Sequence, residues 1–441
     1  MSAPAPTEPA TSSPARRRSL AFHRNFRQLW IGDALGQFGA QLAMLALPIY
    51  AVSTLHATAW QMGALTAAET AAFLLIGLPA GAWVDRMRKR RTLIVADLVR
   101  AAVLAVVVVA GLTGHSSMAL LYAAALTMSA ATVFFDISHQ SYLPGLVGLE
   151  HVVEGNSKLQ ATQSVAAVVA PAVGGALLRV ISAPALIAGT VLTYLTSAAA
   201  VGRITHEETL PARADRRPLR TEIAEGVRFV IHQPLLRRIV ACTSIGNFAG
   251  AASNALMVIY ALRVLELDAA TLGLVYSVSS VGGILGAVLA DRVARWVGEG
   301  RAIALSALAW VPALALTPLA APLARVGIPA AATLIVGGGV ATFLIIVYNV
   351  AQVSFRQRLC PPALLGRMNA SVRFIVWGVM PIGGLLGGFL GTHLGVVPTL
   401  WVGVAGSALA SLPVVLSPLA RMRDLPGRPD EATEAVVDAQ G

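Results

Sequence analysis

The chain has 441 residues, of which 56% are hydrophobic and 12% charged, with a formal net charge of +11. Its mean hydropathy is +0.71. So few polar residues cannot cover the surface of a water-soluble particle of 45.7 kDa. The composition therefore excludes an ordinary soluble protein and indicates a chain that crosses a membrane several times.

Twelve apolar stretches of about 20 residues follow one another from Leu29 to Leu416. A helix of that length crosses the roughly 30 Å hydrocarbon core of a bilayer. The predicted spans are 29–53, 59–84, 92–112, 117–140, 158–180, 184–202, 239–262, 270–290, 302–322, 327–350, 371–391 and 395–418. We predict an all-α membrane protein with twelve transmembrane helices in two pseudo-symmetric six-helix bundles.

The spans and the polar segments between them predict five regions. We expect disordered cytosolic tails at 1–28 and 419–441, where no apolar periodicity occurs. Six-helix bundles are expected at 29–202 and 239–418. The linker at 203–238 interleaves apolar and charged residues, which is typical of an amphipathic helix on a membrane surface.

Basic residues are distributed unequally between the two sides of the membrane. On one side lie 28 of the 33 lysines and arginines and on the other three, while Arg100 and Arg373 fall within spans. Because basic loops are retained in the cytoplasm, we predict a multi-pass protein of the cell membrane with both termini cytoplasmic. The net positive charge suits the anionic lipid headgroups at that face, so no nucleic-acid partner is expected.

The two halves of the chain share two landmarks. Gly-x-x-x-Gly followed by Asp-Arg occurs at 77–86 and again at 282–292. A proline followed by paired glycines occurs at 171–175 and again at 381–384. Two landmarks repeated at nearly one spacing indicate a parallel duplication, which transporters use to place a substrate site between two rocking bundles.

The segment 81–91, Gly-Ala-Trp-Val-Asp-Arg-Met-Arg-Lys-Arg-Arg, resembles the loop motif of the major facilitator superfamily, with Arg88 in place of the usual second glycine. Five further segments resemble its drug and siderophore exporter branch, which includes macrolide efflux proteins and enterobactin exporters: 25–30, 97–101, 140–144, 154–157 and 366–370. The resemblance covers about residues 22–420. It implies alternating access, with export driven by a proton gradient.

The loop motif suggests a gate. Gly77 and Gly81 share one helix face and should let another helix approach closely. Asp85 could rest against the positive amino end of a helix from the other half, such as the one starting near Asn369, so that breaking the contact favours the other access state. In an alternative interpretation the basic run only fixes topology: Arg86, Arg88, Lys89, Arg90 and Arg91.

The segment 170–175 resembles the fifth-helix motif Gly-Pro-x-x-Gly-Gly associated with antiporters, with Ala170 in place of the first glycine. Pro171 removes a backbone hydrogen bond, while Gly174 and Gly175 allow bending and close packing. This helix is expected to act as a hinge or a tight seal. Proline and glycine also occur in ordinary membrane helices, which is the alternative.

Ionisable residues within spans are the candidates for proton coupling or substrate binding, because each costs on the order of 3 kcal/mol at mid-helix. Glu69 ranks first, since it lies near mid-bilayer with no basic residue nearby in its own helix. The alternative is a hydrogen-bonded structural glutamate. Asp33 lies near the start of the first span, where favourable placement in the helix dipole also explains it.

Two pairs with helical spacing follow. Asp97 and Arg100 can neutralise one another as a structural or gating pair. Asp136 is a further coupling candidate, and His139 could sense pH or simply be solvated. Arg373 could reach the headgroups or meet an acidic partner from the first half.

The fourth span lacks the arginine that many proton-coupled members of the resembled family carry there, for which Arg100 could substitute. Three asparagines, Asn247, Asn254 and Asn349, could contact substrate or form hydrogen bonds between helices.

No common hydrolase, zinc or nucleotide-loop motif occurs, so we expect neither an enzyme nor a cofactor or metal. The expected partners are a small-molecule substrate, protons and membrane lipid, and the expected state is a monomer. The sequence predicts a secondary active exporter of a small amphipathic compound such as a drug, antibiotic or siderophore. An uptake permease of the same fold and a non-transporting membrane receptor or scaffold are the alternatives.

Overall fold

The computed structural model describes residues 20–148, 151–206, 208, 219–361, 364–423 and 425. Within these ranges the regular structure is helical, with no strand. Ten of the described helical segments are long and apolar enough to cross a membrane.

Helices fill both halves of the chain. The amino-terminal half contains η1 (Leu20–Phe22), α1 (Arg24–Ser53), α2 (Ala59–Leu75), α3 (Gly77–Asp85), α4 (Lys89–Leu112), α5 (Met118–Val147), α6 (Val152–Leu177) and α7 (Ala183–Gly202). The carboxyl-terminal half contains α8 (Leu219–His232), α9 (Pro234–Ile259), η4 (Tyr260–Val264), α10 (Ala269–Val297), α11 (Glu299–Arg325), α12 (Ala330–Leu359), α13 (Leu365–Gly378), α14 (Met380–His393), α15 (Val396–Val415) and η6 (Pro418–Ala420).

Twelve crossings result when interrupted helices are joined. The ten apolar segments include α9 with η4 and α13 with α14, each pair counted once. The eleventh crossing is α2 with α3, which meet at Ile76, and the twelfth is α6, whose first half is polar. The predicted number of transmembrane helices is therefore confirmed.

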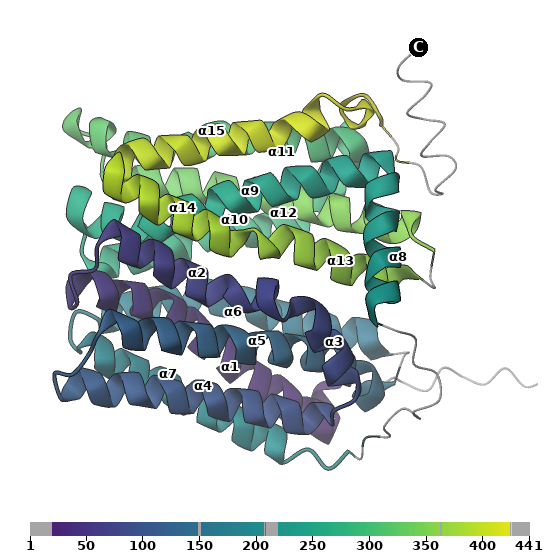
Figure 1. Cartoon of the computed structure of the whole chain (residues 1–441), viewed down its shortest axis with the longest axis horizontal. Coiled ribbons are helices and arrows are strands. Elements are labelled where there is room, and N and C mark those ends of the chain that lie inside the picture. Colours follow the sequence, from purple (N-terminus) through teal and green to yellow (C-terminus); the bar gives the residue numbers. More distant parts are fainter. Residues whose placement is uncertain are drawn as a thin grey trace, which may run out of the picture.

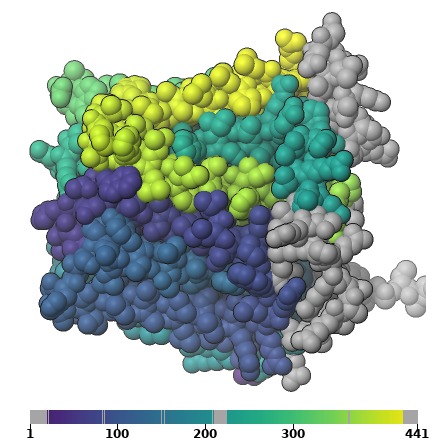
Figure 2. Space-filling view, in the orientation of Figure 1, coloured from purple at the N-terminus to yellow at the C-terminus, as the bar shows by residue number. Residues whose placement is uncertain are grey.

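The two halves pack by one pattern. In the amino-terminal bundle α1 packs on α7, α4 on α7 and α5, and α2 on α5. In the carboxyl-terminal bundle the equivalent α9 packs on α15, α11 on α15 and α12, and α10 on α12. Figure 1 shows the two bundles side by side, and Figure 2 shows the same division at the surface. The predicted pair of related bundles is confirmed.

The molecule has two ends along the helix axes. We call the end that carries α3 and α8 the linker face and the other end, where α1 turns into α2, the opposite face (Figure 1). Tight turns at the opposite face are closed by side-chain caps. Thr58 and Gln61 form a capping box at α2, and Ser117 and Asp268 cap α5 and α10.

Helical structure extends beyond the predicted membrane segments at both ends. α1 begins at Arg24 instead of residue 29, because His23 accepts a hydrogen bond from the backbone N–H of Phe26 and the Phe26 ring is fully buried. At the other end Leu419 is buried, and the N–H of Glu299 donates to the carbonyl of Arg423 at 2.7 Å. The disorder predicted for residues 1–19 and 426–441 lies outside the described residues.

Candidate functional site

Glycines bring the two bundles into backbone contact near the opposite face, where α2 crosses α14. A Cβ added to Gly63 would lie 2.6 Å from the carbonyl oxygen of Gly384. A Cβ added to Gly388 would lie 2.9 Å from the Cα of Gly63. No larger residue fits at these positions without displacing a helix, so this crossing closes the space between the bundles.

A second crossing, between α6 and α10, mirrors the first. A Cβ on Gly175 would lie 3.0 Å from the Cα of Gly273, and Ser277 donates to the carbonyl of Val168 at 2.5 Å. Gly174 faces α1 of its own bundle instead. The predicted hinge or seal segment, with Pro171 inside one continuous α6, therefore forms a tight cross-bundle contact. We call the two crossings together the glycine seam.

Polar contacts reinforce the glycine seam at the opposite face. Arg179 pairs with Asp268 across the bundles at 3.1 Å, and Arg263 donates to the carbonyl of Val52 at 3.0 Å. Hydrogen bonds from the hydroxyl and the backbone N–H of Thr271, helped by Arg179, hold the pKa of Asp268 below its usual value of 3.8. These contacts join α6 to α10 and η4 to α1.

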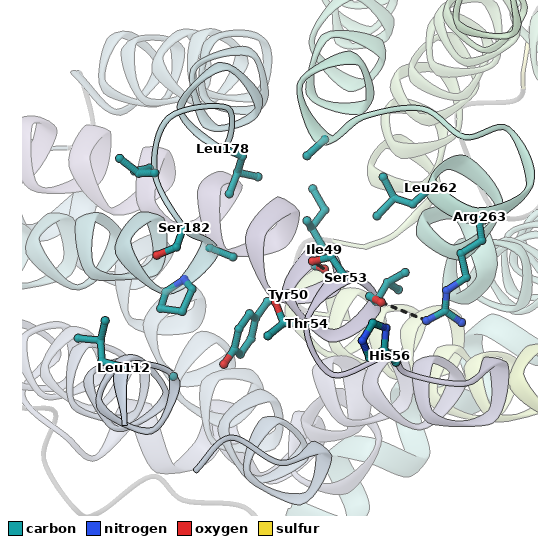
Figure 3. Close-up of a pocket in the computed structure, with 16 residues that line it drawn as sticks. Ile49, Tyr50, Ser53, Thr54, His56, Leu112, Leu178, Ser182, Leu262 and Arg263 are labelled. Carbon is teal, nitrogen blue, oxygen red and sulfur yellow. Dashed lines mark hydrogen bonds between the residues drawn. The ribbon is translucent and has the colours of Figure 1, made fainter. Parts of the chain in front are cut away.

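A hollow of about 830 Å³ opens beside these contacts, as Figure 3 shows. Tyr50, His56 and Arg263 lie around it, together with the end of α4 and the turn between α6 and α7. None of the residues that the sequence put forward as site candidates lines it. The ionisable candidates lie between the glycine seam and the linker face instead.

Glu69 lies on the side of α2 that faces the carboxyl-terminal bundle. It follows Thr66 by three residues, and Thr66 touches Gly384 of α14. It precedes Phe73 by four, and the Phe73 ring packs edge-on against Trp377 of α13 at 4.5 Å. Glu69 is half-buried and has no hydrogen-bond or ion-pair partner among the described residues.

Asp97 and Arg100 form a buried ion pair inside the amino-terminal bundle, with 3.2 Å between Oδ1 and Nη1. Ser197 of α7 donates to the other carboxylate oxygen at 2.7 Å. The guanidinium lies 4.5 Å from the centre of the Phe135 ring and 5.4 Å from that of Tyr194. Both charges are thus compensated and enclosed.

Asp33 of α1 is buried next to this pair. Its Oδ1 lies 3.4 Å from the amide nitrogen of Gln37, which donates to it, and 3.5 Å from Nε2 of His139. The imidazole stacks on Phe135. His139 is therefore not simply solvated, because its ring stacks on Phe135 and its Nε2 faces Asp33.

Asp136 reaches across to the other bundle. It accepts a hydrogen bond from Nη2 of Arg373 on α13 at 3.2 Å, and both side chains are about one-third exposed. The guanidinium also lies 5.4 Å from the Phe73 ring centre and 5.1 Å from that of Trp377. Of the two alternatives left open for Arg373, the structure shows the acidic partner.

The close helix approach expected at Gly77 and Gly81 is wrong for this conformation. A Cβ added to either glycine would meet no atom within 4 Å. Their counterparts Gly282 and Gly286 do pack closely, but against α12 of their own bundle. α3 does contact α13 and α8 of the other half, but not at these two glycines. The side chain of Asp85 lies outside the described residues.

Two residues of the basic run, Lys89 and Arg90, have a structural role. Arg90 donates from Nε to the carbonyl of Val201 at 3.2 Å and from Nη2 to that of Gly202, which caps the end of α7. Glu208, just beyond α7, accepts bonds from the N–H groups of Lys89 and Arg90 at 2.7 Å each and so caps α4. Arg86 is exposed, with no partner among the described side chains.

The three asparagine candidates separate. Asn247 donates to the carbonyl of Val376 at 2.7 Å, next to the break between α13 and α14, so it makes a bond between helices. Asn349 accepts from Gln352 at 3.4 Å within α12. Asn254 is exposed on α9. The structure therefore does not bring these residues together.

Sequence reasoning missed Gly63, Gly273 and Glu208. The glycines of the seam lie in apolar stretches where nothing marks which partner helix they face. Glu208 carried a weaker signal, since an acid directly after a span and near basic loops suits a helix amino terminus.

Known proteins resemble the chain along most of its length. The family model described as Major Facilitator Superfamily matches residues 29–379. Relatives include "Enterobactin exporter EntS" of Citrobacter koseri, 24% identical over 430 residues (94% of this chain, 97% of that protein). "Multidrug efflux pump Tap" of Mycolicibacterium fortuitum is 26% identical over 409 residues (89% of this chain, 95% of that protein).

Solved structures share the fold. A bacterial homologue of the iron transporter ferroportin, in an inward-facing state, gives a TM-score of 0.71 at 16% identity, covering 90% of this chain and 99% of its own. The nucleoside transporter NupG gives 0.74 at 12% identity, covering 89% and 99%. With the family model matching most of its length and the same paired bundles in its structure, the chain belongs to the Major Facilitator Superfamily and is an integral membrane transporter.

Proposed function

We propose that the chain is a secondary active exporter that moves a small amphipathic compound out of the cell in exchange for protons. The relatives named as an enterobactin exporter and a multidrug efflux pump support the direction and the class of cargo. Proton exchange is supported by the concentration of ionisable side chains within the amino-terminal bundle.

The linker face is assigned to the cytoplasm, because it carries most of the basic residues. The glycine seam then blocks the outer side, and cargo enters between the bundles from the cytoplasm. Export requires a second state in which the seam opens and the linker face closes. A Cβ on Gly77 or Gly81 would meet open space here, so these glycines are suited to receive a helix in that second state, with Asp85 beside them.

The observation that carries the proposal is the position of Glu69. An uncompensated carboxylate deep in a membrane protein is costly, whereas a protonated carboxyl is not. Glu69 faces the other bundle just inside the glycine seam, so movement of the bundles would change its access to water. Proton uptake from outside and release inside would follow from that change.

Asp136 and Arg373 couple the two bundles on the cytoplasmic side of Glu69. Their ion pair spans α5 and α13, so loss of the Asp136 charge would release Arg373. Asp97, Arg100 and Asp33 are buried deeper in the amino-terminal bundle. Their charges contribute to the electrostatic environment of Asp136.

Cells that express the protein test the direction of transport. Growth is measured against a panel of chemically diverse amphipathic toxins, with empty cells, wild type, Glu69→Gln and Glu266→Gln. Glu266→Gln is the matched control, because it removes an exposed carboxyl at the opposite face. We expect wild type and Glu266→Gln to raise resistance to at least one toxin and Glu69→Gln to lose it while reaching the membrane in equal amount.

Greater sensitivity of the wild-type cells, with accumulation of the toxin inside, would show an uptake permease and contradict export. Binding of a toxin without any movement would favour a receptor. Full resistance in Glu69→Gln would remove Glu69 from the coupling mechanism.

A further inference from the structure

An apolar groove of about 610 Å³ runs along the outer flank of the amino-terminal bundle, between α4 and α5. These helices lie side by side, and α3 meets them at the linker face (Figure 1). One wall is formed by Val95, Ala96 and Val99 and the other by Ala130, Ala131 and Phe134. Val95 is 57% exposed, so the groove faces the bilayer and not the space between the bundles.

Three arginines surround the end of the groove at the linker face: Arg86, Arg88 and Arg91. All three are exposed and none has a side-chain partner among the described residues. Their neighbour Arg90 differs, because it caps α7. Exposed arginines whose side chains cap no helix terminus and form no ion pair are free to bind an anion.

The length of the groove matches one leaflet. From Lys89, where α4 begins, to Val99, the deepest residue of that wall, the helix rises about 15 Å at 1.5 Å per residue. Half of the roughly 30 Å hydrocarbon core is also about 15 Å. An acyl chain that fills the groove therefore places its headgroup phosphate at the level of the arginines.

We propose that this groove is a binding site for an anionic phospholipid of the leaflet next to the linker face, with one acyl chain between α4 and α5 and the phosphate among Arg86, Arg88 and Arg91. Charge complementarity selects an anionic headgroup over a zwitterionic one. The apolar walls select a lipid over free phosphate. The site is separate from the cargo route and does not depend on the direction of transport.

Trp83 reports on the groove, because its ring stacks on Phe134 at 6.2 Å and is 44% exposed. The full chain in detergent is titrated with phosphatidylglycerol that carries brominated acyl chains, which quench nearby tryptophan. The Trp83 signal is the difference between the protein and its Trp83→Phe variant. The same titration uses phosphatidylcholine with identical brominated chains.

We expect phosphatidylglycerol to saturate the Trp83 signal at a concentration at least about fivefold lower than phosphatidylcholine, the effect of roughly one basic contact. The combined change Arg86→Gln, Arg88→Gln and Arg91→Gln should abolish that preference. The matched control changes Arg292, Arg295 and Arg301 to Gln at the same face of the other bundle and should preserve it. Thr127→Phe, at the deep end of the groove, should weaken both lipids alike.

Three outcomes would overturn the proposal. If both lipids saturate the wild-type Trp83 signal at the same concentration, the groove binds acyl chains without selecting the headgroup. Equal loss in the control triple variant would reduce the effect to general surface charge. Displacement of the brominated lipid by inorganic phosphate alone would show an anion site that needs no acyl chain.

Discussion

The two bundles share one pattern of helix packing, yet their interiors differ in charge. The amino-terminal bundle encloses Asp33, Asp97 and Arg100, and Asp136 projects from it. In the carboxyl-terminal bundle none of the described charged side chains is fully buried; Asn247 makes a neutral hydrogen bond there, and Arg373 meets Asp136 of the other bundle. The two halves therefore share their packing, while the fully buried charged side chains of the described residues all lie in the amino-terminal half.

The largest expected effect is on the charged interior. Asp97→Asn leaves the Arg100 guanidinium buried without a counterion and should lower the free energy of unfolding by about 3 kcal/mol. In the carboxyl-terminal bundle, Asn247→Ala removes one neutral hydrogen bond and should cost about 1 kcal/mol. Thermal unfolding of both variants in detergent compares them. Equal losses would mean that the interiors do not differ as described, and adding Arg100→Gln to Asp97→Asn should restore part of the loss.

The next prediction concerns the contact between the bundles. Gly388→Leu cannot fit against Gly63 and should cost the closed seam about 1–3 kcal/mol, which shifts the population toward opening at the opposite face. A cysteine introduced at buried Thr66 should then react about tenfold faster or more with a membrane-impermeant maleimide. Gly189→Leu is the control, since a Cβ there meets open space. Unchanged labelling in Gly388→Leu would show that the seam is not the barrier.

A smaller effect is expected for the ion pair that joins the two interiors. Asp136→Asn, Arg373→Gln and their combination form a double-mutant cycle. Because both side chains are about one-third exposed, solvent screening limits their coupling to about 1 kcal/mol or less. Unfolding free energies measure it. A coupling of several kcal/mol would mean that the pair is shielded from water, which would contradict the partly exposed ion pair described above.

The smallest effect is at the opposite face. The lowered pKa of Asp268 means that its contribution to stability is fully present above the usual value of 3.8 and is lost as the pH falls through the lowered value. Asp268→Asn should therefore flatten slightly the fall of the unfolding temperature between about pH 5 and pH 2. An identical pH profile in the variant would contradict the cap and ion-pair assignment.

The sequence was sufficient for features that repeat or that depend on length and polarity. Apolar segments predicted twelve crossings, and the repeated landmarks predicted two related bundles. The start of α1 was missed, because the cap by His23 and the burial of Phe26 depend on tertiary contacts. For the same reason the break between α2 and α3 at Ile76 could not be predicted, because the surrounding sequence is uniformly apolar.

The candidate site was predictable in its residues but not in their pairing. Asp97 and Arg100 lie one helical turn apart, so spacing alone suggested their contact. Asp136 and His139 share that spacing, yet they contact Arg373 and Asp33 on other helices. Such partners depend on how the helices are rotated in the bundle, which one sequence does not specify. The contacts of Gly77 and Gly81 likewise depend on how the two bundles are placed relative to each other.

Proton movement in sealed vesicles tests the central claim most directly. Inside-out vesicles are acidified inside, and a pH-sensitive dye follows proton loss when a toxin from the growth screen is added. We predict toxin-dependent proton release with the wild type and Glu266→Gln, and none with Glu69→Gln. Equal proton release with and without the Glu69 carboxyl, or toxin transport that leaves the pH difference untouched, would contradict proton exchange through Glu69.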